Sequence, residues 1–219
     1  PNPIDRQRFM GSASDRWISV DLQGSEWAKR SRAAEVKFFG VLAHEISHLY
    51  TAQTRKDFGR IAWMNEGGAD YFANRLARYV GLIDQAQFDA RIGAAIEECV
   101  RLRKMSSDSL VLPAPRTNPG VPYQCGMVVH AATDILMGKA IPARKFFGFW
   151  GDLIRNAESS GGLYSEREYF DLARRWAPSA DLEFLADFVE NPNRDADNDG
   201  RRLRKILKTS GDSSVEVSR

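Results

Sequence analysis

The spacing of apolar residues along the chain predicts a protein built mainly from helices. From about residue 32 to residue 53 there is no proline, and apolar side chains recur every three or four positions, which is typical of a helix. Comparable patterns predict further helices, over about 62–80, 84–104, 123–138, 142–157, 165–176 and 179–190. Residues 16–22 alternate between apolar and polar positions and therefore favour a strand.

Three segments lack these patterns. Residues 1–15 are polar and carry two prolines, so we expect an extended lead-in. Residues 106–122 hold four prolines and predict a loop, whose length is typical of functional or mobile segments. From residue 191 onward turn-forming residues are followed by a basic run, and we expect the last ten residues to be disordered.

Composition and charge exclude several classes of partner. The chain has 31 basic and 29 acidic residues, a net charge of +2, so nothing indicates binding to nucleic acid. No apolar run approaches the roughly 20 residues that cross a bilayer, so we expect no membrane span. Because the chain begins with Pro1 rather than Met, we expect a processed or truncated chain that is soluble and could be exported as a periplasmic or secreted protein.

The motif HEISH at residues 44–48 carries the strongest indication of chemistry. On a helix, residues four apart lie on the same face, so the imidazoles of His44 and His48 can bind one metal ion. Glu45 projects beside that face, where its carboxylate can take a proton from a water molecule at the metal. Zinc lowers the pKa of such a water to about 7. The motif therefore predicts a catalytic zinc site with Glu45 as the base.

A catalytic zinc ion needs a third protein ligand, and Glu66 is the candidate. It follows His48 by eighteen residues, near the start of the second predicted helix, which could pack antiparallel to the first. Asp70 lies four residues further on the same face and can accept a hydrogen bond from the far nitrogen of a ligand histidine. The alternatives are a solvated acid at a helix start for Glu66 and a surface or capping acid for Asp70.

Together these motifs resemble the aminopeptidase-N-like gluzincins, zinc metallopeptidases that include the leukotriene hydrolases and the glycyl aminopeptidases. The residues that carry the resemblance are HEISH at 44–48, WMNEG at 63–67 and VPYQCG at 121–126, which corresponds to the family's tyrosine motif V-P-Y-E-K-G. The resemblance implies that Tyr123 stabilises the oxyanion of the tetrahedral intermediate. The alternative for Tyr123 is a half-buried tyrosine of the core.

The resemblance also implies a fold and a reaction. We expect a mainly α fold with a zincin-type (thermolysin-like) catalytic core over 1–138, a C-terminal helical region over 139–192, and an acidic turn with a basic, disordered tail over 193–219. The expected reaction is zinc-dependent hydrolysis of a peptide or protein substrate. An aminopeptidase is favoured over an endopeptidase by analogy with the family, although its amine-binding motif G-x-M-E-N is absent. A catalytically inactive binding domain and a zinc hydrolase of a non-peptide substrate remain alternatives.

Three further features leave alternatives open. Cys99 and Cys125 lack the spacing of a thiolate zinc site, and the sequence does not decide whether they form a disulfide. His130, on the predicted helix of Tyr123, is either a second donor to the transition state or a packed structural histidine. Residues 195–200 match the first half of an EF-hand calcium loop, but Ile206 stands where that loop needs a carboxylate. We therefore expect an acidic turn there, with a calcium site as the alternative.

Overall fold

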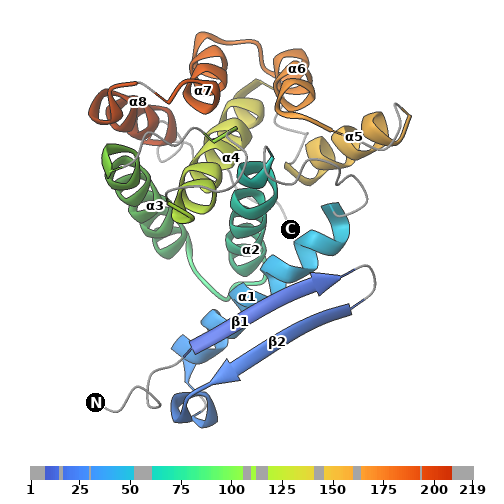
Figure 1. Ribbon diagram of the computed structural model, residues 1–219, viewed down its shortest axis with the longest axis vertical. Coiled ribbons are helices and arrows are strands. Elements are labelled where there is room, and N and C mark those ends of the chain that lie inside the picture. Colours follow the sequence, from blue (N-terminus) through green and yellow to red (C-terminus); the bar gives the residue numbers. More distant parts are fainter. Residues whose placement is uncertain are drawn as a thin grey trace.

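The computed structural model describes residues 8–14, 17–29, 31–51, 61–105, 110–111, 118–140, 146–159, 164–192 and 194–208. These residues form a β-hairpin followed by helices (Figure 1), which confirms a mainly helical protein. The elements are β1 Arg8–Ser14, β2 Trp17–Gln23, the short 3-10 helix η2 Ser25–Ala28, α1 Arg32–Thr51, the π-helix η4 Trp63–Gly67, α2 Gly68–Tyr79, α3 Gln85–Met105, α4 Gly120–Ala140, α5 Phe146–Ser159, α6 Glu166–Trp176, α7 Ala180–Glu190 and α8 Ala196–Lys208.

The hairpin lies against α1 at one end of the molecule (Figure 1). β1 and β2 are antiparallel, and Gly11 faces Val20 while Ala13 faces Ile18 in the register. β2 confirms the predicted strand over 16–22. β1 was expected to be an extended lead-in, which is wrong for residues 8–14. Glycine, serine and alanine have little strand propensity of their own, so the pairing with β2 decides the structure of this segment.

Most predicted helices are confirmed to within a few residues. The second predicted helix is divided in two, because its first turn is the π-helix η4. Asp84 begins α3 as expected, since its Oδ1 accepts a hydrogen bond from the backbone N of Gln87 at 2.7 Å. Most of the predicted loop over 106–122 and the tail beyond residue 208 lie outside the described residues.

The acidic turn and basic tail expected over 193–219 are wrong for residues 196–208, which form α8. Asp195 caps this helix, because its Oδ1 accepts hydrogen bonds from the backbone N of Asp197 and of Asn198. Leu203 is buried on the inner face of the helix. Few apolar residues mark that face, so the surrounding charges concealed the helical pattern. Asp199 is buried, and its carboxylate forms an ion pair with the guanidinium of Arg194 instead of being accessible to calcium.

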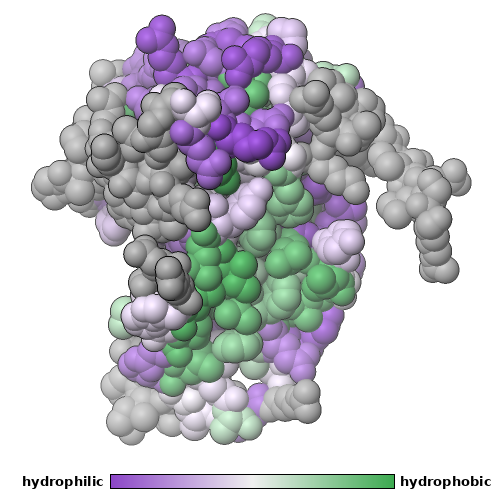
Figure 2. All heavy atoms as spheres, turned by 90° about the vertical axis from the view of Figure 1, so that its right-hand side faces the viewer, coloured by the Kyte–Doolittle hydropathy of each residue, from purple (hydrophilic) through white to green (hydrophobic). Residues whose placement is uncertain are grey.

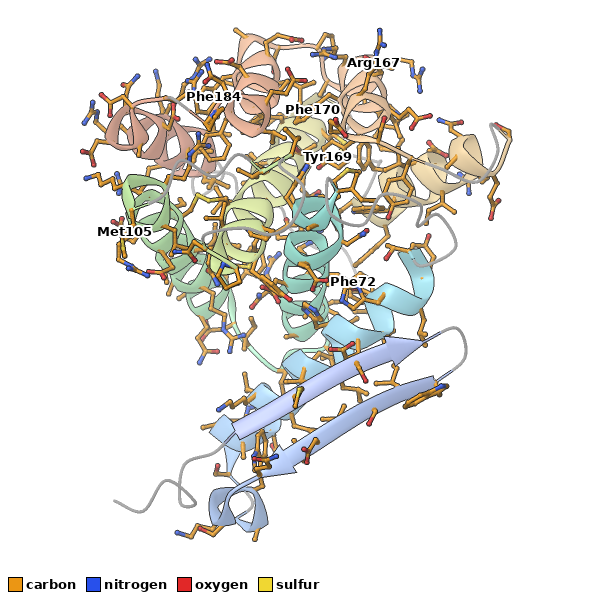
Figure 3. All side chains as sticks on the ribbon, in the orientation of Figure 1. Phe72, Met105, Arg167, Tyr169, Phe170 and Phe184 are labelled. Atoms are coloured by element: carbon orange, nitrogen blue, oxygen red, sulfur yellow. A yellow bond between two sulfur atoms is a disulfide. The ribbon has the colours of Figure 1, made fainter. Side chains whose placement is uncertain are left out.

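The buried apolar residues form one cluster that extends from Ile61 to Ile206. α4 runs through its centre, and Figure 3 shows Tyr169 and Phe170 of α6 between that helix and α4. The cluster includes residues on both sides of position 138. The predicted boundary there, between a catalytic core and a C-terminal helical region, stays a prediction. A disulfide between Cys99 and Cys125 joins α3 to α4.

On one face of the described part of the chain, apolar residues gather in a band. Figure 2 shows it on the face where α1 ends and α5 lies, with hydrophilic residues at its edges. On α1, Phe38, Ile46 and Tyr50 are exposed. None of the helices in the described part of the chain combines the length and the apolar character that a membrane span requires.

Candidate functional site

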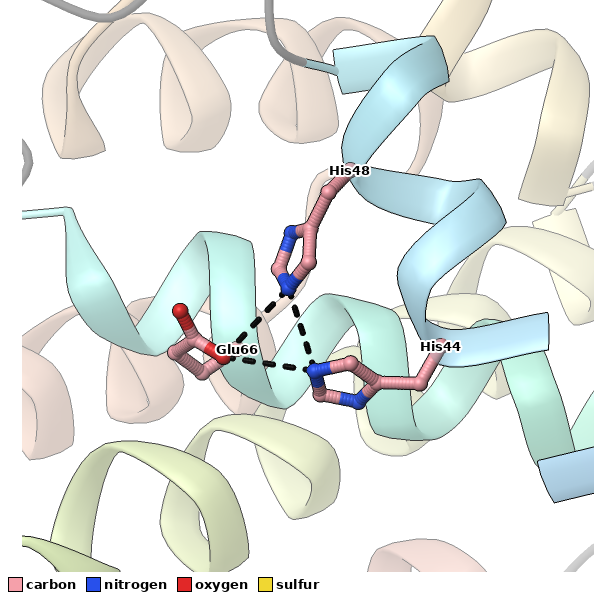
Figure 4. A group of neighbouring side chains, drawn as sticks. All are labelled: His44, His48 and Glu66. Atoms are coloured by element: carbon pink, nitrogen blue, oxygen red, sulfur yellow. Dashed lines mark hydrogen bonds and ion pairs between the residues drawn. The ribbon is translucent and has the colours of Figure 1, made fainter. Parts of the chain in front are cut away.

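Two imidazoles and one carboxylate converge between α1 and the π-helix (Figure 4). His44 and His48 lie one turn apart on α1, and their Nε2 atoms are 3.1 Å from each other. Glu66 extends from the π-helix, with its Oε2 3.3 Å from the Nε2 of His44 and 3.5 Å from that of His48. The three side chains that the sequence singled out as ligands therefore present three donor atoms to one point.

The spacing of these donors fits a zinc ion. Zinc binds imidazole nitrogen and carboxylate oxygen at about 2.0–2.1 Å in tetrahedral geometry, which places two ligand atoms about 3.3–3.4 Å apart. The observed separations of 3.1, 3.3 and 3.5 Å bracket this value. Three protein ligands also leave a fourth position for water or substrate, as in catalytic zinc sites.

Asp70 orients the first histidine. Its Oδ1 lies 2.8 Å from the Nδ1 of His44, so the opposite nitrogen, Nε2, is directed toward Glu66. This is the contact that the shared helix face of Glu66 and Asp70 predicted. The Nδ1 of His48 is buried and has no hydrogen-bond partner among the described residues.

The two carboxylates make the site favourable for positive charge. Burial lowers the pKa of His44, but hydrogen bonds to Asp70 and Glu66 outweigh it and raise that pKa from 6.5 to about 10. Burial raises the pKa of Glu66, yet the hydrogen bonds from His44 and His48 hold it well below its ordinary value. A cation shared by these groups, whether a proton or a metal ion, is therefore stabilised here.

Glu45 lies next to the donors and beneath the first strand. Its side chain is buried although it carries a carboxylate. A Cβ atom built on Gly11 would lie only 2.3 Å from the Oε1 of Glu45, so the backbone of β1 closes over this carboxylate. Gly11 was not predicted as a residue of the site. A glycine inside a strand often marks such a close approach, but the strand itself was not predicted.

Tyr123 completes one wall of a cleft at the site. The cleft has a volume of about 1020 Å³, and His44, Glu45, Asp70 and Tyr123 all line it. The ring of Tyr123 is parallel to that of His44, with centroids 6.2 Å apart. Burial and the negative charge of Glu66 raise the pKa of Tyr123, so its phenol stays protonated and can donate a hydrogen bond.

A close contact between two glycines fixes Glu66 relative to Tyr123. A Cβ atom built on Gly67 would lie 2.4 Å from the Cα of Gly126, and one built on Gly126 would lie 2.3 Å from the carbonyl oxygen of Trp63. The π-helix and α4 thus meet backbone to backbone. Each glycine belongs to one of the motifs on which the resemblance rests, because Gly67 follows Glu66 and Gly126 lies one turn after Tyr123.

His130 lies in the core and not at the cleft. Its ring is completely buried and stacks on Trp63 with centroids 5.4 Å apart, while its Nδ1 is 3.0 Å from the hydroxyl of Tyr169. Burial lowers its pKa to about 3, so the imidazole is neutral. Of the two interpretations of this residue, the geometry agrees with the packed structural histidine.

The chain matches none of the family models, curated proteins or solved structures with which it was compared. No family is therefore shown for it. What supports a function is the set of side chains described above and the way the helices bring them together.

Proposed function

We propose that the protein is a zinc-dependent peptidase of the gluzincin type, whose hairpin and first helices form a zincin-like (thermolysin-like) catalytic core. One observation carries this proposal: the Nε2 atoms of His44 and His48 and the Oε2 of Glu66 lie 3.1–3.5 Å apart at one end of a cleft. Two imidazoles and a carboxylate are a common ligand set of catalytic zinc in peptidases.

The residues around the donors provide the remaining chemistry. A bound zinc ion would supply Lewis acidity, which lowers the pKa of a water molecule to about 7 and polarises the scissile carbonyl. Glu45 takes the proton of the attacking water and delivers it to the leaving amine. Tyr123, whose raised pKa keeps its proton in place, donates a hydrogen bond to the oxyanion that develops on the carbonyl. Asp70 holds His44 in the required orientation.

The strand beside the cleft supports a peptide as the substrate. Among the described residues β1 pairs with β2 alone, so one of its edges has backbone groups without a partner strand. An extended peptide can bind to such an edge through its own backbone. Gly11 lets this strand lie directly over Glu45, the proposed catalytic base.

The Cys99–Cys125 disulfide supports an oxidising location. Disulfides persist in secreted and periplasmic proteins, whereas cytosolic thiols are kept reduced. We therefore propose that the protein acts after export.

Metal content and a peptide library test the proposal together. The purified protein should contain one zinc per chain, and His44→Ala or Glu66→Ala should bind far less because only two protein ligands remain. Digestion of a mixed peptide library then separates an aminopeptidase, which the family analogy favours, from an endopeptidase by the position of the cuts.

Glu45→Gln is the matched control for the chemistry. The amide has nearly the same volume but cannot accept the proton of water, so zinc content should be unchanged while the rate falls about 10²–10⁴-fold. Full activity in the metal-loaded variant would refute the mechanism. A zinc-loaded wild-type protein that cuts no peptide would point instead to a binding domain or to a hydrolase of another substrate.

A further inference from the structure

The cleft continues beyond the metal ligands between α1 and α3, and this outer part is basic. Its apolar lining comes from small or branched residues, which are Ala33, Val36, Val41, Ile83 and Ala90. Three cations also line it, Arg32, Lys37 and Arg91. The two carboxylates that line the cleft, Glu45 and Asp70, both lie at its metal end. A substrate that extends into the outer part therefore meets positive charge over an apolar floor.

Arg91 differs from the other two cations in its partners. Arg32 forms an ion pair with Glu35 at 3.8 Å and donates hydrogen bonds to the carbonyl oxygens of Gly81 and Leu82, at 3.1 and 2.7 Å. Lys37 lies over the ring of Trp27 at 5.7 Å. The Nη1 of Arg91 donates to the side-chain oxygen of Asn74 at 2.9 Å, and no carboxylate of the described residues forms an ion pair with it.

The contact with Asn74 also fixes where the guanidinium of Arg91 lies. The Nδ2 of Asn74 donates to the backbone oxygen of Asp70 at 2.8 Å. Asp70 in turn holds His44 through its carboxylate. A chain of hydrogen bonds thus runs along the cleft wall from His44 to Arg91. It holds the partly buried guanidinium near the proposed metal site, with N–H donors that remain available to a ligand.

We infer that Arg91 binds a carboxylate of the peptide substrate and so gives the enzyme a preference for peptides that place a carboxylate in the outer part of the cleft. This inference rests on the proposed function and specifies its substrate class. A guanidinium offers two parallel N–H donors that match the two oxygens of a carboxylate, and such bonds are strong in a partly buried site. The carboxylate belongs either to an aspartate or glutamate side chain or to the C-terminus of the peptide.

Matched peptides distinguish these two sources. We would measure kcat/KM for hexapeptides that carry Glu or Gln at each position in turn, every one with a free and with an amidated C-terminus. Loss of a hydrogen bond to a charged group corresponds to about 10- to 100-fold. We expect an advantage of that size for Glu at one position if a side chain is bound, or for the free C-terminus if the terminal carboxylate is bound.

Arg91→Gln should lower kcat/KM far more for the peptides that carry the carboxylate than for those that lack it, so that the ratio between the two series falls to about one. Arg101→Gln is the matched control, because Arg101 lies on the same helix, is exposed and pairs with Glu98. Arg91→Lys keeps the positive charge but lacks the two parallel N–H donors, so it should retain part of the preference. Arg91→Glu should shift the preference toward peptides with lysine at the same position.

Two outcomes would overturn the inference: a wild-type enzyme that cleaves peptides equally well in both comparisons, Glu against Gln and free against amidated C-terminus, or an Arg91→Gln variant that loses the same factor on peptides with and without the carboxylate. The second result would mean that Arg91 acts only through Asn74 on the metal site. Calorimetric binding of the same hexapeptides, with Glu or Gln and with a free or amidated C-terminus, to the Glu45→Gln protein tests the inference even if no peptide is cut. Tighter binding of the peptides that carry the carboxylate, which is lost when Arg91→Gln is added to the Glu45→Gln protein, supports the inference. Equal binding in both comparisons refutes it.

Discussion

Replacing Gly126 by alanine is expected to push the π-helix away from α4. Because Glu66 lies on the π-helix and Tyr123 on α4, these two side chains should also move apart. The new Cβ atom would lie 2.3 Å from the carbonyl oxygen of Trp63 and 3.0 Å from the Cα of Gly67. Non-bonded heavy atoms are most stable at about 3.5–4.0 Å, so the two backbones must separate by about 1 Å. Both partners are main chain, and no side chain can rotate to relieve the contact.

The magnitude follows from this displacement. Overpacking of this kind costs about 1–3 kcal/mol of stability. For a chain of this size the midpoint of thermal unfolding falls by roughly 2–4 °C for each of these kcal/mol. A catalytic group misplaced by about 1 Å can lose about 100-fold in rate. Gly126→Ala should therefore lose more activity than its modest loss of stability explains.

The assay combines thermal unfolding, zinc affinity against a competing chelator, and kcat/KM on one peptide. Gly138→Ala is the control, because Gly138 is on the same helix and a Cβ atom there meets nothing within 4 Å. Alanine at that position should be neutral or stabilise the helix by up to about 1 kcal/mol. A Gly126→Ala variant with the melting temperature, zinc affinity and kcat/KM of the wild type would refute the reasoning.

Three further predictions test other parts of the structure. Tyr123→Phe should bind zinc and fold normally but lose about 10²–10³-fold in kcat; an unchanged kcat would mean that another group stabilises the oxyanion. Replacing both Cys99 and Cys125 by alanine should cost about 3–4 kcal/mol in denaturant unfolding, because the disulfide closes a loop with a sequence separation of 26; equal stability would show that the bridge does not constrain the unfolded chain. His130 has a folded pKa of about 3 against an ordinary value of 6.5, so its contribution to stability is present above pH 6.5 and lost as the pH falls toward 3. In the metal-free protein this amounts to about 2–3 kcal/mol between pH 7 and pH 4.5, and urea unfolding of His130→Gln should show a smaller loss; an identical pH dependence would contradict it.

Local periodicity made much of the site predictable. His44 and His48 share a helix face because they are four residues apart, and Glu66 and Asp70 share another for the same reason. The contact between Asp70 and His44 follows once the two helices pack against each other. Tyr123 could be assigned only through the resemblance, because fifty-seven residues separate it from Glu66 and no local pattern joins them.

What the sequence did not predict depends on contacts between distant segments. β1 is a strand because it pairs with β2. The need for a glycine at position 11 is visible only in the fold, where this strand lies over Glu45. In the sequence, nothing distinguishes Arg91 from other helix residues, and only the fold shows that it lines the cleft beside Asn74. Likewise, α8 is recognisable only from the few apolar positions that it buries against the core.

The C-terminal helices are structurally coupled to the proposed metal site through the π-helix. Asn65, the residue before Glu66, accepts a hydrogen bond at 2.8 Å from the hydroxyl of Tyr164, which precedes α6. Trp63 packs edge-on against Tyr169 of α6 and stacks on His130 of α4. A π-helix is less stable than an α-helix and occurs mostly where function requires it. Aromatic packing and the bond to Asn65 can stabilise that turn, so the helices far from the cleft help to direct Glu66 toward the two histidines.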